Sequence, residues 1–168
     1  MSMSQPYLDA RGAFLDERLR RQHQELNMTN DDKQALASID VSPQEAFDIT
    51  MGVSRLVRAS HGASVKAGWY TDRATGQPLS RNRAEMIALM HSELSEALEG
   101  ERKGLQDDHL PHRPSAEVEL ADCVIRICDY AGAWGYDLAG AILEKLAYNA
   151  QRRDHTLEAR REAGGKAF

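Results

Sequence analysis

Apolar residues recur at intervals of three and four along most of this 168-residue chain, and this spacing is the strongest constraint on its fold. Side chains three or four positions apart share one face of an α-helix, whereas a half-buried strand alternates apolar and polar residues. Such alternation is scarce here, and the chain contains no internal repeat or low-complexity segment. We therefore expect an all-α protein.

The first part of the chain predicts one or two helices before a strong helix start at residue 42. One apolar face is predicted for a first helix by Leu8, Leu15, Leu19 and Leu26. The polar stretch 27–32 is typical of a turn. Ser42 and Glu45 match a capping box, and Pro43 suits the first helical position, so a long helix should begin there.

Three further helices are predicted after residue 80. Asn82, with Glu85 three positions on, predicts a start, and Gly104 predicts the end of a helix that runs to about Lys103. Ser115 is expected to cap a helix that ends near Gly132.

Asp137 is expected to cap the last long helix, and segments 68–80 and 106–114 read as loops. Helices joined by short loops usually pack as an antiparallel bundle. We therefore expect an antiparallel four-helix bundle from Ser42 onward, with extra helices before it.

Composition excludes several classes of protein. The N-terminus is polar and no apolar run reaches the roughly 18 residues of a membrane span, so we expect a cytoplasmic protein with no membrane partner. Cys123 and Cys128 are the only cysteines, and on a helix they would point about 140° apart, which argues against a disulfide or a cysteine-based zinc module. The net charge of −5 argues against a stable nucleic-acid partner.

Charge is distributed unevenly along the chain. Residues 85–122 hold ten acidic side chains and three basic ones, whereas residues 145–168 hold six basic and three acidic ones. An acidic centre followed by a basic tail suits a site that holds metal cations and the anions that accompany them. Charge alone is equally compatible with solvated helix faces of opposite sign.

Two acidic couplets carry the most specific chemistry. Glu93 and Glu96 are three residues apart, and so are Glu119 and Asp122, so each couplet lies on one helix face. If the two helices are antiparallel neighbours, four carboxylates converge, and their mutual repulsion calls for a counter-charge. Carboxylate oxygens suit Mg²⁺ or Mn²⁺. A single couplet is common on ordinary solvent-exposed helices, and the pair is what predicts a metal site.

Other metal and nucleotide motifs are missing. Neither couplet ends in histidine, as a carboxylate-bridged di-iron bundle would require. The chain has no HExxH motif, EF-hand loop or Walker A sequence. His91 and Glu93 match half of a zinc-deaminase motif, but the cysteine half does not follow.

The order of the acidic couplets resembles the ExxE…ExxD signature of MazG-like nucleoside triphosphate pyrophosphohydrolases, with 22 residues between Glu96 and Glu119. Further similar features are a tryptophan ahead of the first couplet and a Lys-x₃-Asn-x₂-Arg pattern near the C-terminus. The stretches HSELSEALEGERKG, LPHR, ELADCVIRI and KLAYNAQRRDH look closest to phage-type dATP/dGTP pyrophosphohydrolases. The resemblance covers about residues 66–155, which suggests an N-terminal extension of unknown role (1–63) and a catalytic domain (64–168).

The resemblance implies a reaction and a set of ligands. Four carboxylates would bind Mg²⁺ or, in its place, Mn²⁺: Glu93, Glu96, Glu119 and Asp122. A water molecule would attack the α-phosphorus of a (deoxy)nucleoside triphosphate, releasing pyrophosphate and a monophosphate. Glu96 is the expected proton acceptor, with Glu93 beside it. The family also implies a homodimer or homotetramer, in a bacterial or phage-infected cell.

Five further residues are candidates for substrate binding. Lys145, Asn149 and Arg152 would share one helix face and reach phosphate, sugar or base, although basic residues are favoured at a helix C-terminus in any case. Trp69 could stack on the base, and Lys103 could contact phosphate or simply end its helix. Two alternatives stay open: a related hydrolase of dUTP or a modified pyrimidine nucleotide, and a non-catalytic nucleotide-binding helical regulator.

Overall fold

A computed structural model of the chain describes residues 29–162, which form helices joined by turns. Five α-helices carry most of the described chain: α2 (Asn30–Ala37), α3 (Pro43–Lys66), α4 (Arg83–Lys103), α5 (Ser115–Trp134) and α6 (Leu138–Ala150). A short 3-10 helix, η1 (Arg153–His155), and α7 (Leu157–Arg161) follow. Residues 29–162 contain no strand, only two isolated β-bridges, which confirms the all-α prediction for that range. The helix predicted from Leu8 to Leu26 lies outside the described residues.

None of the helices between residues 29 and 162 combines the length and the apolar character needed to cross a bilayer.

Two predicted helix starts are confirmed in atomic detail. At the start of α3, Glu45 accepts hydrogen bonds from the Ser42 backbone N–H (2.8 Å) and hydroxyl (2.6 Å), and the Ser42 hydroxyl accepts one from the Glu45 N–H (3.2 Å). These bonds lower the pKa of Glu45. At the start of α4, the Asn82 side chain accepts from the backbone N–H groups of residues 84 and 85. Both caps satisfy amide groups that a helix leaves unpaired in its first turn.

The predicted end of α4 is also confirmed. Gly104 adopts the left-handed conformation (φ 61°), and its N–H donates to the last turn of the helix. Arg102 and Lys103 lie in that turn, where positive charge is favoured by the helix dipole.

Two local predictions were wrong. Residues 30–32 form the first turn of α2, because the polar side chains expected in a turn also favour a helix N-terminus. Ser115 is the first residue of α5, preceded by Pro114 and without a side-chain cap. The predicted end of this helix near Gly132 is close to the observed end at Trp134, where Gly135 adopts the left-handed conformation (φ 66°).

The described chain divides into two compact units, and α3 contributes to both. The first unit covers residues 55–136 and the second covers residues 29–54 with 137–162. The expected division between residues 63 and 64 falls within α3 and stays a prediction.

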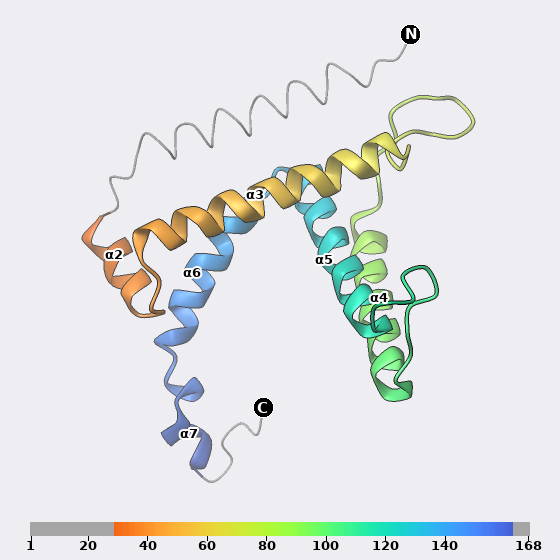
Figure 1. Ribbon diagram of the computed structural model, residues 1–168. Helices are drawn as coiled ribbons and strands as arrows, with labels where there is room; N and C mark the ends of the chain where they lie inside the picture. The colour runs from red at the N-terminus through yellow and green to blue at the C-terminus, as the bar shows by residue number, and fades with distance from the viewer. Residues whose placement is uncertain (1–28, 163–168) are drawn as a thin grey trace. The chain divides into compact units, whose positions relative to one another are not determined.

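Helices α4 and α5 form an antiparallel hairpin in the first unit, where they lie side by side (Figure 1). Small residues line their contact. Ala97 and Cys123 are buried, and the Cys123 thiol lies 3.7 Å from the Met90 carbonyl oxygen. Near the turn, Gly100 lies so close to Ser115 that a Cβ there would be 2.8 Å from the Ser115 hydroxyl. The two backbones can approach closely because no larger side chain separates them.

A buried polar network joins α3 and the 68–80 loop to α5. His61 Nδ1 lies 2.8 Å from Asp129 Oδ1, and the Tyr70 hydroxyl donates to the same oxygen at 2.9 Å. Asp129 is only 6% exposed, so these bonds satisfy a carboxylate that would be costly to bury alone. Gly132 contacts His61 one turn further along α5.

In the second unit, α2 packs on α6. The side chains of Leu36, Ala139 and Ala147 are buried there. Asp137 caps α6 by accepting from the Gly140 N–H at 3.1 Å, as predicted.

Candidate metal centre

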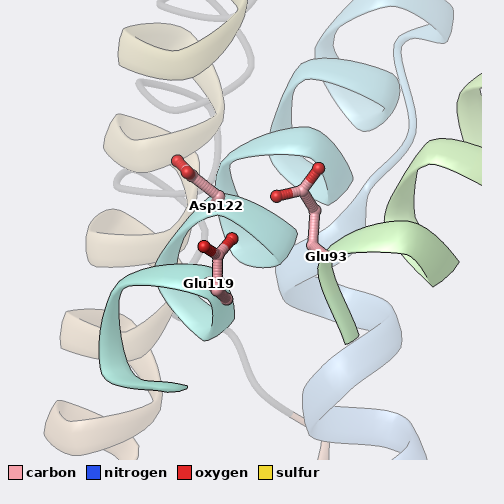
Figure 2. A group of neighbouring side chains, drawn as sticks. All are labelled: Glu93, Glu119 and Asp122. Atoms are coloured by element: carbon pink, nitrogen blue, oxygen red, sulfur yellow. The ribbon is translucent and has the colours of Figure 1, made fainter. Parts of the chain in front are cut away.

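Three of the four predicted metal ligands converge between α4 and α5. Glu93, Glu119 and Asp122 each offer a carboxylate oxygen, and these oxygens lie within 4.8 Å of one another. Figure 2 shows Glu93 on α4 facing the couplet on α5. The i, i+3 spacing of Glu119 and Asp122 and the antiparallel hairpin bring these three together, whereas Glu96, predicted as the fourth member, lies outside the group.

The three carboxylates differ in exposure. Glu93 is 5% exposed, Glu119 is half-buried and Asp122 is exposed. The group therefore has a buried end and an end open to solvent. A ligand could approach from the side of Asp122.

The pKa of Glu119 is raised in this group of carboxylates. Burial is the largest cause, followed by the charge of Glu96, a hydrogen bond with Glu93, and the charges of Glu93 and Asp122. The other three predicted ligands, Glu93, Glu96 and Asp122, therefore all contribute to the raised pKa of Glu119. A divalent cation would reverse this effect, because it favours the ionised form.

Glu96 occupies a different position from the other three carboxylates. It is exposed and does not belong to the group whose oxygens lie within 4.8 Å. Its charge nevertheless acts on Glu119. Glu96 thus lies beside the three carboxylates and not among them.

Sequence reasoning missed Arg126, which contacts the candidate centre directly. Its Nε donates to Glu93 Oε1 at 2.7 Å. Arg126 follows Asp122 by four residues and Glu119 by seven, so it shares their helix face. Extending the helical spacing of the couplet by one turn would have identified it.

The donor set fits a hard divalent cation. The three clustered side chains offer only oxygen atoms, which suits Mg²⁺ or Mn²⁺ and not the cysteine and histidine sites of structural zinc. Mg²⁺ usually keeps several water ligands and binds through one or two carboxylates plus phosphate oxygens. Glu93, Glu119 and Asp122 would leave room for such ligands.

Trp69 and Lys103, two of the predicted substrate-binding residues, belong to the first unit. Trp69 is 61% exposed, and the Arg81 guanidinium lies over its ring at 5.5 Å from the centroid. Lys103 forms an ion pair with Glu99 one turn earlier on α4. Trp69 is thus exposed but already has a cation over its ring, and Lys103 has a partner on its own helix.

The other three predicted substrate-binding residues belong to the second unit. Lys145 Nζ lies over the Tyr148 ring, 4.5 Å from its centroid. The buried Oδ1 of Asn149 has no hydrogen-bond partner among the described residues. The shared helix face was wrong for Arg152, because α6 ends at Ala150.

Arg152 instead forms two hydrogen bonds with Asp154, from Nε (3.0 Å) and Nη2 (2.7 Å). This pairing raises the pKa of the guanidinium. The residue therefore has a local partner just beyond the helix.

Comparison with known proteins found no matching family model, no similar curated protein and no similar solved structure. What the chain does must therefore be inferred from its own residues.

Proposed function

We propose that the chain is a Mg²⁺-dependent hydrolase that converts (deoxy)nucleoside triphosphates, and purine deoxynucleotides in particular, to monophosphate and pyrophosphate. The observation that carries the proposal is the convergence of Glu93, Glu119 and Asp122 from two neighbouring helices. The resemblance of the couplets to MazG-like enzymes supplies the reaction and the substrate class.

Each carboxylate has a role in the proposed reaction. Glu93, Glu119 and Asp122 would hold Mg²⁺, which supplies charge neutralisation for the triphosphate and a lower pKa for an attacking water. Glu96, exposed beside them, would accept the proton of that water. The water oxygen forms a bond to the α-phosphorus, the bond between this phosphorus and the bridging oxygen breaks, and pyrophosphate leaves. No covalent intermediate is required.

The proposal includes a MazG-like four-helix bundle and a homodimer or homotetramer. Large apolar side chains on α4 and α5 remain 45–60% exposed: Leu94, Leu98, Leu120 and Val124. Exposed apolar patches often mark protein interfaces. A second copy of the chain that covers this surface would also bring further residues to the site.

The test is hydrolysis of each dNTP and NTP by purified protein, with and without Mg²⁺ or Mn²⁺, and with the products resolved by ion-exchange chromatography. We expect monophosphate and pyrophosphate only with metal, and the fastest nucleotide identifies the substrate. Glu96→Gln should reduce turnover by about 10²–10⁴-fold, the usual contribution of a general base. Glu117→Gln is the matched control, because Glu117 pairs with Arg113 and lies outside the cluster.

Other products would contradict specific parts of the proposal. Diphosphate and phosphate would place the attack at a different phosphorus. Turnover confined to dUTP or another pyrimidine nucleotide would replace the purine substrate. Metal or nucleotide binding without turnover would favour a helical regulator.

A further inference from the structure

Arg126 pairs with Glu93, the most buried carboxylate of the candidate centre, and its own side chain is partly exposed to solvent. Its Nε lies 2.7 Å from Glu93 Oε1, where the Glu93 side chain is 7% exposed and the Arg126 side chain is 41% exposed. A carboxylate this deeply buried requires a partner, since desolvation of an unpaired charge is costly. Holding Glu93 is therefore one task of Arg126.

The contact with Glu93 uses only part of the guanidinium. Arginine has five N–H donors in a planar fork. Within residues 29–162, no hydrogen bond is made by either terminal nitrogen of Arg126. With two-fifths of the side chain exposed, these donors can reach an incoming acceptor while Nε keeps its bond to Glu93.

An anionic ligand needs such a donor here. Residues 85–122 hold ten acidic side chains and three basic ones, so the approach to the carboxylates repels a phosphate unless cations are present. The planar fork of arginine matches phosphate geometry better than lysine does. Arg126 is a cation that is hydrogen-bonded directly to one member of the carboxylate cluster, Glu93.

We propose that Arg126 is a substrate-binding residue, which holds Glu93 through Nε and donates from its terminal nitrogens to a phosphate oxygen of the nucleotide. The inference rests on the proposed function, because the phosphate must lie beside the metal-bound carboxylates. Phosphate binding was expected from Lys145, Asn149 and Arg152, and this inference assigns a phosphate contact to Arg126 as well.

The experiment separates phosphate binding from support of the metal ligands. Mg²⁺ is first titrated into the metal-free full-length protein by calorimetry, and inorganic pyrophosphate is then titrated at saturating Mg²⁺. The proteins are the wild type, Arg126→Gln, Arg126→Lys and Arg113→Gln. Arg113 is the matched control, because its Nη1 also lies 2.7 Å from a glutamate, Glu117, outside the cluster.

We expect Arg126→Gln to weaken pyrophosphate binding about 10- to 100-fold at saturating Mg²⁺, the range expected for a hydrogen bond to a charged group. Arg126→Lys keeps the charge but not the fork, so its loss should be smaller. It also serves as the test should the glutamine variant fold poorly. Arg113→Gln should bind pyrophosphate as the wild type does.

The outcomes distinguish the two proposals. If Arg126 only orients Glu93, its variants lose affinity for Mg²⁺, but saturating metal restores pyrophosphate binding, and the phosphate role is refuted. An equal loss in the Arg113 variant would refute it as well. Failure of the wild type to bind Mg²⁺ would overturn the proposed function, and the role of Arg126 with it.

Discussion

Replacement of Gly132 by alanine should destabilise the protein, although alanine is normally the better helix former. A Cβ at residue 132 would lie 2.6 Å from the Cβ of His61 and 2.9 Å from its Cγ. Carbon atoms pack best at about 3.5–4.0 Å, so one of the two helices must move. The Cβ of His61 is fixed by the backbone and cannot rotate away.

The magnitude follows from two opposing contributions. Alanine in place of glycine inside a helix contributes about 1 kcal/mol of stability. Overpacking of this severity costs about 1–3 kcal/mol. Displacing His61 also weakens its 2.8 Å contact with Asp129, which is worth about 1 kcal/mol. The expected net loss is therefore about 1–3 kcal/mol, or a fall in Tm of about 3–10 °C for a chain of this length.

The control lies next to His61 on α3. A Cβ at Gly62 would have no atom within 4 Å, so Gly62→Ala should show only the helix preference, with a gain of about 0.5–1 kcal/mol. Thermal and urea unfolding, followed by circular dichroism, measure both variants. A Gly132→Ala protein as stable as the wild type would refute the close contact between α3 and α5.

Two further predictions concern ionisable groups. Because the pKa of Glu119 is raised above its ordinary 4.5, the folded protein binds this proton more tightly than the unfolded chain does. The metal-free protein should therefore lose stability as the pH rises from about 4.5 through the raised pKa, and this loss should be smaller in Glu119→Gln. The measurement is Tm against pH in the presence of a chelator. A wild-type Tm that rises over this interval, with a Tm that falls in the variant, would contradict the prediction. Burial raises the pKa of the Cys128 thiol, which is 2% exposed, so iodoacetamide should modify it only on unfolding, as mass spectrometry will show. Rapid modification of the native protein would contradict its burial.

The sequence predicted best what short-range interactions decide. The caps at Ser42, Asn82 and Asp137 form as expected, because a capping side chain reaches only two or three residues along its own chain. The start and end of α4 follow for the same reason. The stretch 30–32 was misassigned because its polar residues satisfy a turn and a helix N-terminus equally well.

Contacts between helices were harder to predict. Gly132 was noted only as lying near the end of its helix, whereas its lack of a Cβ allows contact with His61, and this depends on how α3 packs against α5. The pairing of Arg126 with Glu93 joins residues 33 positions apart. Glu96 belongs to the same couplet as Glu93, yet it lies outside the three-carboxylate group. The sequence could not predict this, because the spacing of residues does not show which side of a helix faces its neighbour.

The small residues between α4 and α5 explain why the carboxylates can meet at all. Gly100 and Ala97 line this contact on α4, where a Cβ at residue 100 would lie 3.0 Å from the Ala116 nitrogen. A larger side chain there would push the helices apart and separate Glu93 from the couplet on α5. Close packing, however, also buries Glu119 and brings like charges beside it, and both effects raise its pKa, burial more than the charges. The same contact that stabilises the hairpin thus creates an electrostatic conflict, which Arg126 relieves in part and a divalent cation would relieve further.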